Sequence, residues 1–157
     1  MEKIKIIPYH KKYKSIFKSL NEEWISHYFQ MEEVDYKVLD YPEEYILSKG
    51  GSIFVGLLEG EPLGVCALIK MEDSEYDFEL AKMAVSPIAR GKYLGFSLAT
   101  YAIEFARNGG AKSIFLETNS KLAPAIALYK KLGFKDVPIK HSPYSRVDIQ
   151  MALQIKH

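Results

Sequence analysis

The chain has 157 residues, of which 48% are hydrophobic and 26% are charged, a composition typical of one soluble globular domain spanning residues 1–157. Lysine and arginine total 21 against 20 aspartates and glutamates, so there is no basic surplus of the kind that nucleic-acid binding requires. The sequence has one cysteine, no apolar run of membrane-spanning length and no apolar signal segment at its start. We therefore expect a cytoplasmic protein with no disulfide, no membrane contact and no nucleic-acid partner.

The first third of the chain is predicted to be mainly helical. A short strand at residues 3–7 precedes a helix at 10–29, where apolar residues recur at three- and four-residue steps. Residues 30–41 are less periodic and are expected to form a loop. Pro42 opens a short helix that ends at Gly50, because proline suits a first helical position and glycine suits a helix C-terminus.

Strands and helices alternate in the rest of the chain. Apolar residues 52–58 and 63–70 flank a Glu-Gly-Glu-Pro turn and predict a hairpin. The later elements are expected to be a strand at 77–85, a helix at 95–108, a strand at 112–118, a helix at 121–132 and strands at 134–139 and 146–155. This order predicts an α/β (α+β) domain whose mixed sheet of about six to seven strands is flanked by helices.

The loop between the strand at 77–85 and the next helix is the most informative segment. It carries Arg90, Gly91, Lys92 and Gly95 directly before a helix N-terminus. Free backbone N–H groups at a helix start and along a glycine-containing loop form an anion site, and the two cations add positive charge. The segment therefore predicts a pyrophosphate site, with an ordinary surface turn as the alternative.

Three motifs resemble those of the GNAT superfamily of N-acetyltransferases. Residues 90–95 (RGKYLG) resemble its (Gln/Arg)-x-x-Gly-x-(Gly/Ala) coenzyme A loop, and residues 83–87 (MAVSP) resemble its Leu-x-Val-x-Pro strand end. Residues 124–134 resemble its Ala-Ile-x-Leu-Tyr-x-x-x-Gly-Phe signature. Two positions depart from the pattern: Tyr93 replaces the first loop glycine, and Leu122 stands where members often have a pantetheine-binding asparagine.

The resemblance implies acetyl-CoA as the co-substrate. Tyr93 is expected to have negative φ and an outward side chain, since glycine is needed only at positive φ or at a close backbone approach. The four histidines are scattered, so no metal is expected. The implied cofactor contacts are Met83, Ala84, Val85, Arg90, Gly91, Lys92, Tyr93, Leu94, Gly95, Phe96, Ala125 and, as a substitute for the missing asparagine, Asn119.

The resemblance also suggests two catalytic residues. Tyr129 matches the tyrosine that family members use as a general acid near the departing thiolate; the alternative is an aromatic that packs on the core. Glu79 precedes Met83 by four residues, where histone-type members place a general base; the alternative is a solvated or salt-bridged strand glutamate. The acceptor side is predicted from Trp24, Tyr28 and Tyr144, with Asp40, Tyr41 and Arg146 as further candidates.

Together these expectations describe an acyltransferase that moves an acetyl group to a primary amine of a small molecule, by direct attack in a ternary complex. Two alternatives stay open: an acceptor that is a protein N-terminus or lysine, and a non-catalytic acyl-CoA-binding module. A homodimer is the default expectation for the assembly.

Overall fold

The computed structural model describes residues 3–157, which contain one seven-stranded mixed sheet. The strand order is β1-β2-β3-β4-β5-β7-β6, and only β4 and β5 run parallel. The strands are β1 (Ile4–Pro8), β2 (Ser52–Leu58), β3 (Glu61–Lys70), β4 (Phe78–Val85), β5 (Ser113–Thr118), β6 (Lys135–Val137) and β7 (Ile149–Gln154). The predicted α/β fold is confirmed.

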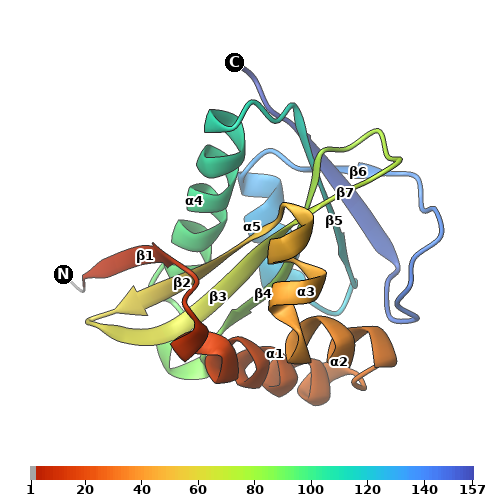
Figure 1. The fold of residues 1–157 in the computed structure, drawn as a ribbon. Coiled ribbons are helices and arrows are strands. Elements are labelled where there is room, and N and C mark those ends of the chain that lie inside the picture. The colour runs from red at the N-terminus through yellow and green to blue at the C-terminus, as the bar shows by residue number, and fades with distance from the viewer. Residues whose placement is uncertain (1–2) are drawn as a thin grey trace.

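Helices cover both faces of this sheet (Figure 1). One face carries α4 (Leu94–Asn108) and α5 (Ala123–Lys131), and we call it the α4/α5 face. The other, the α1/α2 face, carries α1 (Lys14–Tyr28), α2 (Glu33–Asp40) and α3 (Pro42–Tyr45). Three short 3-10 helices complete the chain: η1 (Lys11–Tyr13), η2 (Leu47–Lys49) and η3 (Pro87–Ala89).

The prediction of a loop at residues 30–41 is wrong, because most of this segment forms α2. A capping box starts the helix: the Glu32 side chain accepts from the Asp35 backbone, and the Glu32 N–H donates to Asp35 Oδ2 at 2.9 Å. Val38 and Leu39 lie buried on the inner side of the helix. A helix of two turns has too few apolar positions to show a 3.6-residue periodicity in the sequence. Its formation depends on the capping box and on packing against the sheet.

Strand β4 contains the feature that creates the site. It pairs with β5 only through Phe78↔Ile114 and Glu79↔Phe115, and beyond these pairs the two strands part. On its other edge the register with β3 shifts, so that Lys82 and Met83 together face the single residue Cys66. This β-bulge puts Lys82 at φ +52, and the extra residue bends the strand away from β5.

Candidate active site

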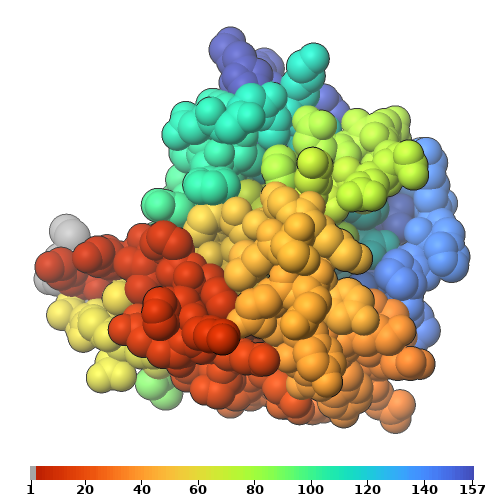
Figure 2. Space-filling model, viewed as in Figure 1, coloured from red at the N-terminus to blue at the C-terminus, as the bar shows by residue number. Residues whose placement is uncertain are grey.

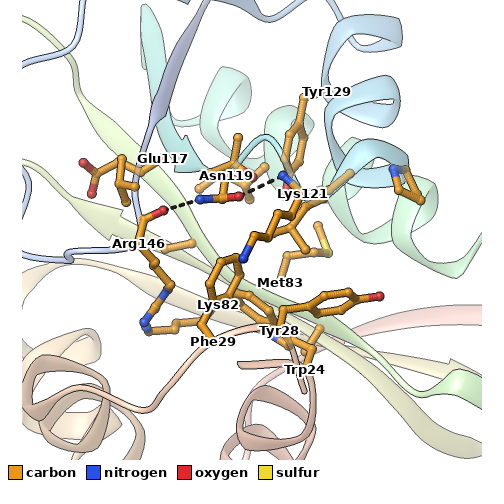
Figure 3. A pocket seen from close by; sticks show the side chains of 18 of the residues that line it. Trp24, Tyr28, Phe29, Lys82, Met83, Glu117, Asn119, Lys121, Tyr129 and Arg146 are labelled. Carbon is orange, nitrogen blue, oxygen red and sulfur yellow. Dashed lines mark hydrogen bonds between the residues drawn. The ribbon is translucent and has the colours of Figure 1, made fainter. Parts of the chain in front are cut away.

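A cleft of about 540 Å³ opens where β4 and β5 part. Its walls come from β4 and the end of β5, the N-terminal half of α5, the C-terminal end of α1 and the segment between β6 and β7. In the close-up, Trp24 and Tyr28 lie on one side of Met83, and Tyr129 lies on the other (Figure 3). Most of the predicted site residues line this cleft: Trp24, Tyr28, Glu79, Met83, Ala84, Val85, Arg90, Gly91, Asn119, Ala125, Tyr129 and Tyr144.

The loop before α4 joins one end of the cleft, through Arg90 and Gly91. No side chain caps α4, so the N–H groups of its first turn are available to an anion. The expected negative φ at Tyr93 is wrong: this residue has φ +64, the left-handed conformation that favours glycine. Its side chain is 73% exposed and so points outward, as predicted.

The remaining loop residues support the site from behind and do not line the cleft. Leu94 is buried and packs close to Gly56 and Gly64 of the hairpin. At Gly95, a Cβ would lie 3.7 Å from Val85 and from Leu128, which is ordinary van der Waals contact, so this position packs between β4 and α5 with room for a Cβ. Lys92 and Phe96 likewise belong to the loop and the first turn of α4, outside the cleft lining.

The other end of the cleft holds a buried cluster of charges. Asp35 accepts hydrogen bonds from both terminal nitrogens of Arg146, at 2.7 and 2.8 Å, and from the Lys82 ammonium, at 2.6 Å. Burial alone would raise the pKa of Asp35, but the Arg146 hydrogen bonds and the Lys82 charge lower it to about 2. The Tyr144 ring lies between the two cations, 4.6 Å from Lys82 Nζ and 4.5 Å from the Arg146 guanidinium carbon.

This cluster joins segments that are distant in sequence. Glu32 also accepts from Arg146, at 3.2 Å, and from the Ser145 N–H, at 3.1 Å. The start of α2 is therefore bonded to the segment between β6 and β7. In the space-filling view the orange residues of the α2 region lie beside the blue residues of that segment (Figure 2). The acceptor candidates Asp40 and Tyr41 are outside the cleft: Asp40 pairs with Lys18, and Tyr41 is largely exposed.

Two carboxylates, Glu79 and Glu117, face the cleft on the α1/α2 side, where β4 and β5 separate. Glu79 forms no hydrogen bond or ion pair within residues 3–157, whereas Glu117 accepts from Gln150 Nε2 at 2.8 Å. Burial, followed by the charge of Glu117, raises the pKa of Glu79 to about 7, although the Lys82 charge opposes the shift. Glu79 can therefore exchange a proton near neutral pH.

Tyr129 lies across the cleft from the α1 wall, on α5. Its ring is buried and meets Phe134 edge-on at 5.9 Å between centroids. Burial, with a smaller contribution from Cys66, raises the pKa of Tyr129 to about 12, so its hydroxyl stays protonated at neutral pH. The sequence allowed two interpretations of Tyr129, a general acid near the thiolate or an aromatic that packs on the core. The side chain both packs on the core and lines the cleft.

Asn119 lines the cleft, but its amide is already bonded within the protein. Its Nδ2 donates to the Arg146 carbonyl at 2.6 Å, and its Oδ1 accepts from the Lys121 N–H at 2.8 Å (Figure 3). These bonds hold the end of β5 against the segment before β7. A pantetheine contact would have to use the second Nδ2 hydrogen or the second lone pair of Oδ1.

Sequence reasoning missed several cleft residues. Glu117 and Lys82 each interrupt an otherwise apolar or small-residue strand, and that interruption was an available signal. Asp35 and Asn21 gave none, because a polar residue in a helix is usually solvated. Among residues 3–157, no group of three or more His, Cys, Asp or Glu side chains could hold a metal ion. In the same range, no helix is both long and apolar enough to cross a membrane.

Comparison with known proteins agrees with this geometry. The family profile described as the acetyltransferase (GNAT) family matches residues 13–134, well over half of the chain. The chain belongs to the GNAT family. One relative is the "uncharacterized N-acetyltransferase YjgM" of Escherichia coli, 38% identical over 66% of this chain and 63% of that protein. Another is the N-acetylaspartate synthetase of Xenopus tropicalis, 36% identical over 62% of this chain and 36% of that protein.

The matched region is thus less than two thirds of the length of these relatives. Solved GNAT structures match the whole fold. An acetyltransferase of Staphylococcus aureus has a TM-score of 0.85 at 20% identity, covering 98% of this chain and 100% of that one. YncA of Salmonella typhimurium, solved with acetyl-CoA, has a TM-score of 0.76 at 20% identity, covering 98% and 94%.

Proposed function

We propose that this GNAT protein transfers the acetyl group of acetyl-CoA to a primary amine by direct attack in a ternary complex. The observation that carries the proposal is the cleft where β4 and β5 part. It connects the uncapped start of α4 with Tyr129 and Glu79, which lie on opposite walls. The acetyl-CoA bound to the structurally similar Salmonella protein supports the choice of co-substrate.

In this proposal the pyrophosphate binds to the loop at Arg90 and to the N–H groups that start α4, because oriented amides at a helix N-terminus favour an anion. The pantetheine arm extends along the free edge of β4. Backbone groups of Met83 and Val85 are two residues apart on that strand, a spacing that suits an extended partner. Ala125 and Asn119 close the other side of the arm.

The chemistry then needs one base and one acid. The amine nitrogen attacks the thioester carbonyl carbon, the C–N bond forms, and the nitrogen gives a proton to Glu79, directly or through a water molecule. The C–S bond breaks, and the departing thiolate takes the proton of the Tyr129 hydroxyl. Near neutral pH a carboxylate with a pKa of about 7 is partly ionised and can accept a proton, while a phenol with a pKa of about 12 keeps the proton that it donates.

Closure of the acceptor end favours a small molecule. The bonds from Glu32 and Asp35 to Ser145 and Arg146 bring α2 against the segment between β6 and β7. An extended peptide would need this end to be open. Aromatic side chains of Trp24, Tyr28 and Tyr144 line the acceptor end, and one relative is named for a small acetylated amine.

A measurement of free CoA thiol, released from acetyl-CoA in the presence of an amine panel, tests the proposal. The panel should contain small primary amines, amino acids and peptides with a free N-terminus or lysine. We expect release that depends on a small amine and exceeds the hydrolysis seen without one. Release with peptides alone would favour the protein acceptor. Tight acetyl-CoA binding with no release from any amine would favour the non-catalytic module.

A further inference from the structure

One buried amide side chain, that of Asn21 on α1, is bonded to two residues that line the cleft, Lys82 and Trp24. Asn21 is fully buried. Its Nδ2 donates to the Phe17 carbonyl at 2.9 Å and, across the sheet, to the Lys82 carbonyl at 3.2 Å. Its Oδ1 accepts from the Trp24 indole N–H at 3.0 Å. Both Nδ2 hydrogens are therefore used, and one of them reaches a strand residue 61 positions along the chain.

The Lys82 carbonyl belongs to the peptide unit at the centre of the β4 bulge. A trans peptide is planar, with its C=O and N–H pointing in opposite directions. The bond from Asn21 to the Lys82 oxygen therefore fixes the direction of the Met83 N–H as well. Lys82, whose carbonyl belongs to this peptide, is a non-glycine residue at φ +52, a strained conformation that persists where neighbours hold it.

Lys82 is held at its other end too. Its ammonium is 2.6 Å from Asp35 Oδ1, and its side chain is 4% exposed. The bulge is thus anchored from α1 through Asn21 and from α2 through Asp35. These two bonds hold the bulge where the β3–β4 ladder is interrupted, between the pairs Val65↔Ala84 and Ala67↔Ala81.

The second bond of Asn21 fixes a wall of the acceptor end. The Trp24 ring lines the cleft, meets Phe29 edge-on at 6.5 Å, and lies 5.8 Å from the Arg146 guanidinium carbon. A tryptophan rotates freely about its side-chain bonds unless its N–H has a partner or its ring is enclosed. The bond to Asn21 Oδ1 selects one orientation.

We propose that Asn21 is a positioning residue. It fixes both the Lys82–Met83 peptide and the Trp24 ring, so that one side chain aligns the acetyl carbonyl with the acceptor amine. The inference rests on the proposed function and adds one assignment to it: the Met83 N–H of β4 is the group that polarises the thioester carbonyl. Reaction rates are sensitive to such alignment: a misplacement of about 1 Å can cost about 100-fold.

Two variants separate the two bonds. Asn21→Leu keeps a side chain of similar size but leaves the Lys82 carbonyl and the Trp24 indole unpaired. Trp24→Phe removes only the indole bond and leaves the anchor of the bulge in place. Asn21→Ser, which is too short to reach Lys82, is the second variant if Asn21→Leu does not fold. Thermal melting shows which variants are folded.

The decisive readout is the thioester carbonyl itself, observed by infrared or ¹³C NMR spectroscopy of acetyl-CoA labelled at the acetyl C1. We expect wild type and Trp24→Phe to shift the bound carbonyl signal equally from that of free acetyl-CoA. The Asn21 variant should return the signal toward the free value and lower kcat about 10- to 100-fold. Its dissociation constant for CoA should change less than about threefold, because the pyrophosphate site lies at the far end of the cleft.

Trp24 is the sole tryptophan of the chain, so its fluorescence reports the acceptor wall independently. Its emission should change in the Asn21 variant. A folded Asn21 variant with a wild-type carbonyl signal would overturn the inference, and so would an equal loss of that signal in Trp24→Phe. If wild type itself fails to bind acetyl-CoA or to shift its carbonyl signal, the proposed function fails first, and the two failures are thereby distinguished.

Discussion

The two ends of the cleft are built in different ways. The cofactor end comes from one continuous stretch, the end of β4, a short loop and the first turn of α4, and it offers mainly backbone groups. The acceptor end comes from side chains of α1, α2, β4, β5 and the segment before β7. One of its buried ion pairs joins residues 35 and 146, which are far apart in the sequence. The cofactor end therefore depends on local conformation, whereas the acceptor end depends on buried charge pairs between distant segments.

The largest effect should come from the residue that lies between the two ends. Tyr129→Phe keeps the ring that packs on Phe134 and removes only the hydroxyl. If this hydroxyl protonates the thiolate, kcat should fall by about 10²- to 10⁴-fold, while acetyl-CoA affinity stays the same. Steady-state kinetics and calorimetry measure the two quantities. Tyr101→Phe, at a tyrosine on α4 outside the cleft lining, serves as the matched control and should leave kcat unchanged. A Tyr129→Phe enzyme with a nearly wild-type rate would remove the residue from the mechanism.

The acceptor end should be the more sensitive to loss of charge. Asp35→Asn leaves Lys82 and Arg146 buried without their anion, so we expect the free energy of unfolding to fall by about 3 kcal/mol and the acceptor KM to rise. Asp40→Asn, which breaks the partly exposed pair with Lys18, should cost less than about 1 kcal/mol. Urea unfolding at pH 7 compares them, and equal costs would contradict the buried role of Asp35.

The same carboxylate predicts a pH dependence. The folded pKa of Asp35 is about 2, below its ordinary value of 3.8, so its ionised form stabilises the fold above about pH 4. That contribution should disappear as the pH falls toward 2. The stability difference between wild type and Asp35→Asn should therefore shrink in acid. A difference that stays constant from pH 7 to pH 2.5 would contradict this account.

A smaller and pH-dependent effect is expected at Glu79. The wild-type rate should rise with pH through about 7 as Glu79 ionises, and Glu79→Gln should lack this rise. The defect should be about 100-fold above pH 7 and should shrink near the pKa of the acceptor amine, where the free base is already abundant. Glu117→Gln removes a neighbouring negative charge, so the rise should move to lower pH. A Glu79→Gln defect that is constant across pH would indicate a structural carboxylate.

The smallest effect concerns the backbone of the cofactor end. Tyr93 has φ +64, where glycine is favoured, so Tyr93→Gly should stabilise the fold by roughly 1 kcal/mol and raise Tm by about 2–4 °C. Affinity for acetyl-CoA should not change, because the exposed ring does not line the cleft. Tyr93→Pro is the opposing variant: proline cannot adopt positive φ and lacks the N–H, so CoA binding should weaken. Equal affinities for the two variants would argue against a backbone role at this position.

The same contrast explains what the sequence could predict. Short motifs and periodicity reflect local conformation. They were enough to predict most of the order of strands and helices, the loop before α4 and the place of Tyr129. The conformation of Tyr93 was predicted wrongly. The motif located this position in the loop, but the tyrosine that replaces the pattern's glycine still has a positive φ.

The acceptor end could be predicted only in part. Trp24, Tyr28 and Tyr144 were expected there. Glu117, which also lines the cleft, and Asp35, which bonds to lining residues, were not expected. Asp35 lies in a segment expected to be a loop, and its partners are in β4 and near residue 146. The β-bulge that turns Lys82 toward Asp35 leaves no composition signal, since it depends on the register between β3 and β4. Sequence patterns of short range cannot report such pairings.

A crystal structure with acetyl-CoA tests the central claim most directly, because the claim is that one cleft holds the cofactor at the start of α4 and presents its acetyl group to the acceptor end. The account predicts the pyrophosphate on the N–H groups between Arg90 and Phe96, and the acetyl carbonyl beside the backbone of Met83 to Val85, with the sulfur near the Tyr129 hydroxyl. A pyrophosphate bound elsewhere, or an acetyl group that does not reach the space between Tyr129 and Glu79, would contradict it.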